Sequence, residues 1–203
     1  MTKKRTFELS LILGLVFTFL LSLAGFDAKC ANIEDNIFRL HIKANSNSDV
    51  DQQLKLKVRD NILELSEDLY EGANNKADAM NIASDNMDLI LANAKNTIKD
   101  NGFDYSVSGE IKKSYFGTRV YENFTLPAGY YDSLKIYIGS GEGENWWCVL
   151  FPKVCLDACS DFDDSIDKNA EEIITNPKDY KVQFKVIEIY NQAKEKINSI
   201  FLK

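Results

Sequence analysis

Residues 37–72, IFRLHIKANSNSDVDQQLKLKVRDNILELSEDLYEG, change from one hydrophobic period to another and thereby decide the fold class. In FRLHIK, apolar and polar residues alternate, which predicts a strand with one buried face. The polar stretch 45–49 then offers helix N-caps. From there to Gly72, apolar residues recur at helical spacing. The members of that helical stripe are Leu54, Val58, Ile62, Leu65 and Leu69.

The middle of the chain continues this mixture of periods. A second helix is predicted over 76–99, with Met80, Ala83, Met87, Ile90, Ala94 and Ile98 as its buried stripe. Alternating residues then predict strands over 105–112, 119–125 and 134–138. The run WWCVLF is apolar on both faces, as expected of a central, covered strand. The pattern predicts an α+β fold: a mixed or antiparallel sheet of four to five strands packed against two long helices, with a C-terminal helix.

The C-terminal region is less regular. Residues 160–178 are rich in Asp and Glu and predict an acidic loop with room for a short helix. After it, Val182, Phe184 and Val186 alternate, which favours a strand over 180–186 followed by a helix over 187–201. A single helix beginning at Asn176-Pro177 fits nearly as well, because Asn caps helices and Pro suits the first turn.

The N-terminus has the features of an export segment. Lys3, Lys4 and Arg5 precede an uncharged apolar run from Leu9 to Phe26. A positive flank before such a run is typical of a signal peptide or membrane anchor, and cleavage after Ala24 is one possible outcome. We therefore expect residues 1–26 to direct export, residues 27–36 to form a tether, and residues 37–203 to form one extracytoplasmic domain.

Charge and cysteine content restrict the classes of function. The net charge of −7 and the lack of a basic stripe argue against nucleic-acid binding. Outside the cytoplasm, Cys30, Cys148, Cys155 and Cys159 are candidates for disulfides, and we predict the pair Cys148–Cys155 across a short strand. A zinc site using Cys148, Cys155, Cys159 and His41 is less favoured, because the cysteine spacing is unusual for zinc. We predict no cofactor and no metal.

A catalytic constellation is hard to assemble from this sequence. His41 is the only histidine, and neither a nucleophile elbow nor a cysteine-protease signature accompanies it. Gly139, Gly141 and Gly143 follow a predicted strand, but Glu142 and Glu144 would repel a phosphate. We therefore interpret residues 139–144 as a hairpin loop. In the strand that follows, neighbouring Trp146 and Trp147 should point to opposite faces, unless both are covered and belong to the core.

Two stretches resemble one known family. FRLHIKANSNSDVDQQLKLKVRDNILE (38–64) and AGYYDSLKIYIGSGEGENWWCVLFPKVC (128–155) both look like stage II sporulation protein R of endospore-forming bacteria. With the interval between them, the resemblance covers residues 38–155. It implies a protein made in the forespore and exported into the space between forespore and mother cell. There it would activate a membrane-embedded aspartic protease that processes the early mother-cell pro-sigma factor.

The resemblance implies a binding protein, not an enzyme. For such a protein we predict two partner-binding surfaces. One combines strand, loop and helix: His41, Asn45, Ser46, Asp49, Asp51, Gln52, Lys55, Lys57 and Arg59. The other is the predicted hairpin, with Asn145, Trp146 and Trp147 held by Cys148 and Cys155. The bland interpretation of the first surface is a capping loop beside a solvated helix face.

Two other classes of function compete with this one. The first is an exported hydrolase acting on cell wall or septum, with His41 and a carboxylate such as Asp49 or Glu142. The second is a structural module held at the membrane by an uncleaved N-terminal helix. Substitution separates an enzyme from a binding surface, because an enzyme loses its activity at one carboxylate and a surface loses affinity gradually.

Overall fold

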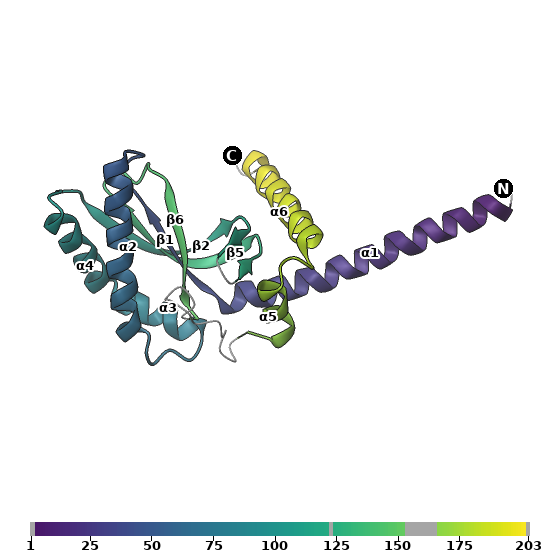
Figure 1. The fold of residues 1–203 in the computed structure, drawn as a ribbon, viewed down its shortest axis with the longest axis horizontal. Helices are drawn as coiled ribbons and strands as arrows, with labels where there is room; N and C mark the ends of the chain where they lie inside the picture. The colour runs from purple at the N-terminus through teal and green to yellow at the C-terminus, as the bar shows by residue number, and fades with distance from the viewer. Residues whose placement is uncertain (1–2, 122–123, 153–165, 202–203) are drawn as a thin grey trace. The chain divides into compact units, whose positions relative to one another are not determined.

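The computed structural model describes residues 3–121, 124–152 and 166–201 (Figure 1). Its chain forms two compact units. The sheet unit consists of Glu34–Phe116 and Tyr130–Asp167. The helical unit consists of Met1–Ile33, Gly117–Gly129 and Lys168–Lys203.

The sheet unit contains a mixed four-stranded sheet and three helices. Its strands are β1 (Phe38–Lys43), β2 (Val107–Phe116), β5 (Gly129–Ile138) and β6 (Asn145–Phe151). They lie in the order β2-β5-β1-β6, with β1 parallel to β5 and antiparallel to β6. Its helices are α2 (Asp49–Leu69), α3 (Lys76–Asp85) and α4 (Met87–Asp100). The predicted α+β class, with a mixed sheet and a C-terminal helix, is confirmed.

The three helices cover one face of this sheet, as Figure 1 shows, and the core lies between them. Strand alternation sends every second apolar side chain toward the helices. The sheet contributes Phe38, Leu40, Ile42, Leu134, Ile136, Ile138, Cys148 and Leu150 to this core. The helices contribute apolar residues at helical spacing: Leu54, Val58 and Ile62 from α2, and Ile90, Ala94 and Ile98 from α4.

The strand order differs from the sequence prediction. β5 and β6 do not form the predicted hairpin, because β1 lies between them. Among the described residues, β6 is at one end of the sheet rather than at its centre, where WWCVLF was expected. The inner strands are β5 and β1, and both faces of β1 are buried, including Arg39 and His41. The alternation in FRLHIK therefore separates two buried faces of the strand, and not a buried face from a solvent-exposed face.

Two further elements are shorter than predicted. The helix expected over 76–99 is divided at Asn86, which ends α3 and begins α4. The side-chain amide of Asn86 donates to the carbonyl of Ile82 at 2.9 Å, a local bond that competes with helix continuation. The strand expected over 119–125 is instead a pair of two-residue strands, β3 (Arg119–Val120) and β4 (Thr125–Leu126).

The helical unit contains α1 (Lys3–Asn36), α5 (Lys168–Thr175) and α6 (Lys181–Phe201). Its small core joins α1 to the two later helices, and its members are Phe26, Cys30, Ile173, Phe184 and Ile187. The strand predicted over 180–186 is wrong. Phe184 and Ile187 are the buried residues there, and their spacing of three is helical, so packing selects the single-helix alternative.

Among the described residues, α1 is the helix long and apolar enough to cross a membrane. Its most apolar window has a mean hydropathy of 2.4 and is almost entirely exposed. The residues predicted as a tether, 27–36, continue this helix. The last three residues of α1 belong to the sheet unit and lead directly into β1.

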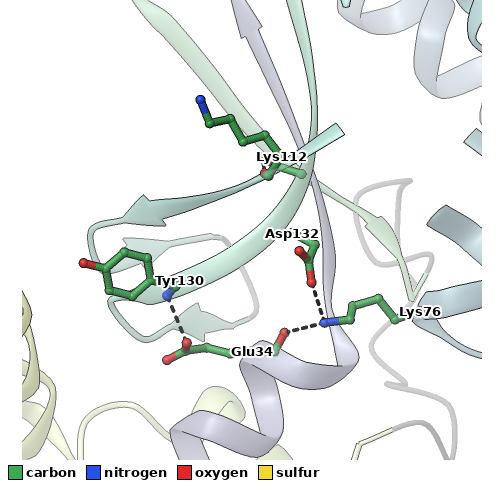
Figure 2. A network of polar contacts seen from close by, with 6 residues as sticks. Glu34, Lys76, Lys112, Tyr130 and Asp132 are labelled. Atoms are coloured by element: carbon green, nitrogen blue, oxygen red, sulfur yellow. Dashed lines mark hydrogen bonds and ion pairs between the residues drawn. The ribbon is translucent and has the colours of Figure 1, made fainter. Parts of the chain in front are cut away.

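A half-buried polar network fixes the start of the sheet (Figure 2). The Lys76 ammonium lies 2.8 Å from the Asp132 carboxylate and donates to the Glu34 carbonyl at 3.3 Å. The Glu34 carboxylate accepts from the Tyr130 amide at 2.9 Å. On β5, the Ser133 hydroxyl donates to the Lys112 carbonyl of β2 at 3.0 Å. These bonds connect the end of α1, the start of α3 and the first residues of β5.

Candidate functional site

The other end of the sheet is closed by two interlocked loops. Residues 44–48 connect β1 to α2, and residues 139–144 connect β5 to β6. We call the two loops together the clasp. The Gly143 amide donates to the Ala44 carbonyl at 2.9 Å, and the Glu144 amide donates to the Asn47 side chain at 2.7 Å. Ser140 donates through its hydroxyl to the Asn45 carbonyl at 2.7 Å.

A buried carboxylate organises the first loop of the clasp. Asp51 accepts from the Ser46 hydroxyl at 2.6 Å and from the Asn45 amide at 2.9 Å. Ser48 caps α2 by accepting from the Asp51 amide. Burial acts to raise the pKa of Asp51, but hydrogen bonds from Ser46, Asn45, Tyr105 and Ser48 outweigh it. The pKa therefore lies below its ordinary value, and the carboxylate stays charged.

A buried cation connects helix and clasp. The Lys55 ammonium on α2 donates to the Glu144 carbonyl at 3.1 Å and to the Gln52 side chain at 2.6 Å. Gln52 in turn donates to the Ser46 carbonyl at 2.8 Å. Burial lowers the pKa of Lys55. One helix face therefore holds backbone carbonyls of both loops, which explains why polar residues occupy these α2 positions.

Two glycines permit the close approach of the loops. Gly139 has φ +58°, in the left-handed region, and packs against the Asn45 side chain. A Cβ at Gly143 would overlap the backbone carbonyl of Ser46. The alternate glycines of GSGEG thus admit a second backbone segment as well as making a turn.

The face of the sheet opposite the helices carries an aromatic cluster around His41. Its ring stacks on Trp147, with ring centres 4.0 Å apart and planes inclined by 14°. Its Nε2 donates to the Asn145 side-chain oxygen at 2.8 Å, and its Nδ1 is buried without a hydrogen-bond partner among the described residues. Burial lowers the pKa of His41 to about 4, against the opposing effect of the Asn145 bond. The positive charges of Lys135, Lys43 and Arg39 lower this pKa further.

Arg39 extends this cluster along β1. Its guanidinium carbon lies 4.2 Å from the Phe116 ring centre and 5.1 Å from that of Tyr131. Phe116 also meets Trp147 edge-on at 4.6 Å. Cation–π contacts of this kind are strongest where water is excluded, and Arg39 is fully buried.

The other tryptophan lies on the helix side. Trp146 pairs with Ile42 across the strands, whereas Trp147 pairs with His41, so the two rings occupy opposite faces as strand alternation requires. The Arg59 guanidinium carbon on α2 lies 4.3 Å from the Trp146 ring centre. Both tryptophans are half-buried, so each combines packing with some accessible ring surface.

The structure separates the predicted partner-binding residues by exposure. His41, Asp51, Lys55 and Cys148 are buried. Asn45, Ser46, Gln52, Arg59, Trp146 and Trp147 are half-buried, and Asp49, Lys57 and Asn145 are exposed. All of them lie at the clasp end of the sheet unit or along α2 and β6. Cys155, the predicted partner of Cys148, and Cys159 lie outside the described residues, so the disulfide stays a prediction.

Sequence reasoning missed several residues that build this region. Arg39, Phe116 and Tyr131 were not selected, because their contacts join strands that are distant in sequence. Asn47 and Ser140 were assigned to ordinary loops. The alternating glycines were the one available signal, since a run of glycines permits close backbone approach as well as a turn.

Comparisons of the sequence with known proteins identify its family. The chain matches the family model for stage II sporulation protein R over residues 34–161. It is 39% identical over 124 residues to the stage II sporulation protein R of Bacillus subtilis (strain 168), covering 61% of this chain and 55% of the relative. The chain thus spans about half the length of this curated relative, and no solved structure matches. Since the family match covers more than half of the chain and both loops of the clasp, the chain belongs to the stage II sporulation protein R family.

Proposed function

We propose that this chain is an exported sporulation signal that activates a membrane-embedded aspartic protease of the mother cell. Activation would trigger processing of the early mother-cell pro-sigma factor. Family membership over residues 34–161 is the observation that carries this proposal. The apolar α1, with Lys3, Lys4 and Arg5 before it, supports export into the space between the two cells.

Activation by a protein ligand requires that it bind the active state of the protease better than the inactive state. We assign this contact to the clasp end of the sheet unit. Asn145, Asp49 and Lys57 are exposed there, and the half-buried Trp146 and Trp147 supply aromatic surface. Half-buried aromatic residues on a rigid support are typical anchors of protein interfaces. The clasp bonds supply that rigidity by fixing both loops beside β6.

The environment of His41 supports a role in binding and not in catalysis. Among the described residues, its hydrogen-bond partner is the Asn145 side-chain oxygen, and not the carboxylates of the competing hydrolase, Asp49 and Glu142. A pKa of about 4 leaves the ring neutral and poorly basic at neutral pH. We therefore propose that the ring orients Asn145 and stacks under Trp147.

The decisive experiment reconstitutes the full chain with membranes that contain the candidate protease and its pro-sigma substrate. We expect cleavage of the precursor to depend on the added chain. No cleavage with folded chain present would contradict the signalling role.

Two charge reversals locate the contact surface. Lys57→Glu changes an exposed α2 residue of the predicted surface, and Lys99→Glu makes the same change on α4 outside it. We expect Lys57→Glu to raise the chain concentration needed for half-maximal cleavage severalfold, and Lys99→Glu to leave it unchanged. Equal effects of the two variants would remove the proposed surface, but not the signalling role.

A further inference from the structure

The C-terminal helix α6 has apolar residues on two faces, and the core uses only one. Phe184 and Ile187 face Phe26 and Ile173 in the helical unit, and the Asn191 amide on the same side donates to the Ala128 carbonyl at 3.1 Å. The second face carries large apolar side chains that are more than half exposed: Val182 at 62%, Ile189 at 56%, Tyr190 at 59% and Ile197 at 54%. On a helix of 3.6 residues per turn, these four form one stripe on the side away from the core.

The charge of α6 is opposite to that of the chain. The helix carries four lysines and two glutamates, whereas the chain as a whole has a net charge of −7. Lys185 and Lys196 lie along one edge of the exposed stripe by helical position, and Lys185, which is 66% exposed, also pairs with Glu188 at 3.0 Å. An apolar stripe with lysines beside it is typical of helices that lie in the interface of an anionic membrane.

The contact between the end of the apolar run of α1 and the start of α6 determines where the stripe lies relative to a membrane that α1 would enter. The apolar run of α1 ends at Phe26, whose ring centre lies 5.8 Å from Tyr180 and 5.3 Å from Phe184. These two residues are the last before α6 and a member of its first turn. If α1 occupies a bilayer, α6 therefore begins where α1 leaves the hydrocarbon core. A stripe at that level meets lipid headgroups.

We propose that α6 docks its exposed stripe, Val182, Ile189, Tyr190 and Ile197, on the anionic lipid surface from which α1 emerges. The inference rests on the export proposed above and takes the apolar run of α1 to stay in the membrane as an anchor, without cleavage after Ala24. The membrane contact then has two parts, a spanning helix and an interfacial helix. The second contact restricts the rotation of the helical unit about the α1 axis.

The test places one fluorescent amino acid, excited above the tryptophan band, at a single position of the full chain in nanodiscs. The discs contain equal parts of phosphatidylcholine and phosphatidylglycerol, with bromine both on acyl carbons near the headgroups and near the ends of the acyl chains, so that probes at either depth are quenched. The three positions are Leu15 in the apolar run of α1, Tyr190 on the stripe, and the exposed Gln192. Gln192 is two residues from Tyr190, about 160° away around α6, and lies at the lysine edge beside the stripe, so it reports where the contact ends.

We expect strong quenching at Leu15 and Tyr190 and severalfold weaker quenching at Gln192. Replacing phosphatidylglycerol by phosphatidylcholine should reduce quenching at Tyr190, because the α6 contact uses lysines, and leave Leu15 unchanged, because Leu15 lies in the uncharged apolar run of α1. Since neither Tyr190 nor Gln192 belongs to the core of the helical unit, labelling leaves that core intact.

Three outcomes would overturn the proposal. Equal quenching at Tyr190 and Gln192 with Leu15 quenched would remove the α6 contact and leave membrane insertion standing. Absence of quenching at Leu15 would remove both insertion of α1 and the α6 contact that rests on it. A Tyr190 probe shielded from water, unquenched by lipid and crosslinked to a second copy would assign the stripe to self-association. Precursor cleavage, measured separately, tests the signalling role independently of all three.

Discussion

At the scale of single residues, the clasp requires that the residue at position 143 have no side chain. The position of Gly143 against the Ser46 carbonyl leaves no room for a Cβ, and the obstacle is backbone, which cannot rotate away. We expect Gly143→Ala to lower the free energy of unfolding by about 1–3 kcal/mol, as overpacked sites do. Urea unfolding followed by tryptophan fluorescence in detergent measures this loss. Gly72→Ala, with open space around its Cβ, is the matched control and should stay near the parent value.

His41 makes stability depend on pH in a defined window. The folded-state pKa of His41 is about 4, below the ordinary 6.5. Between these two pH values, His41 is protonated in the unfolded chain and neutral in the folded chain. The stabilisation is complete above pH 6.5 and is lost as the pH falls toward 4, by up to about 3 kcal/mol. We expect His41→Gln to flatten the unfolding free energy between pH 6.5 and 4. An unchanged slope would mean that other groups cause the acid sensitivity, Asp51 being the candidate at the lower end of this range.

At the scale of elements, the Lys76–Asp132 pair connects α3 to β5. Both side chains are mostly buried, at 15% and 19% exposure, so removing one partner leaves the other poorly solvated. We expect Lys76→Met to cost about 1–3 kcal/mol in urea unfolding. Lys95→Met is the control. Like Lys76, Lys95 also donates to a backbone carbonyl, that of Tyr105 at 2.7 Å, but its carboxylate partner Asp104 is 94% exposed, and such surface pairs contribute less than about 1 kcal/mol. Equal losses in the two variants would show that burial does not strengthen the first pair.

Local periodicity predicted most helices and strands, but not which strands lie next to each other in the sheet. The stripes of α2 and α4 depend on residues three or four apart, and the sequence therefore revealed them. The place of β1 at the centre depends on its parallel pairing with β5, some ninety residues later, which no local pattern encodes. Arg39 and His41 looked solvent-exposed for the same reason, since the rings that cover them come from β2, β5 and β6.

The candidate site was also predictable only where its contacts are local in sequence. Asn45 and Ser48 belong to the stretch 45–49 that was predicted to offer helix N-caps, and Ser48 does cap α2. Asp51 was predicted as a surface residue and is instead a buried carboxylate that accepts from Asn45. That Lys55 and Gln52 hold the first loop and also reach Glu144 requires the clasp, and so the strand order. Of the predicted surface, Asp49, Lys57 and Asn145 are exposed. The proposed function rests on the resemblance of whole motifs to one family, because folds alone do not specify activity.

At the scale of the whole molecule, the chain divides into two units with separate cores, and the family match follows the sheet unit closely. The helical unit takes its core from the two ends of the sequence, with Phe26 from α1 and Phe184 from α6. Local stability can therefore differ between the units, because each opens by breaking its own contacts. The residues after the apolar run of α1 act as part of a folded core in this arrangement.

Phe26→Ala tests that division. Phe26 is 3% exposed and stacks with Tyr180 and Phe184, so its removal should cost the helical unit about 3–5 kcal/mol. Hydrogen exchange followed by mass spectrometry, on the full chain in nanodiscs, should show faster exchange in α5 and α6 while α2 and α4 keep their protection. Phe7→Ala, the same change at a residue 70% exposed on the same helix, should alter neither unit. Faster exchange across α2 and α4 as well would show that the two cores unfold together, and that the sheet unit depends on α1 for its stability.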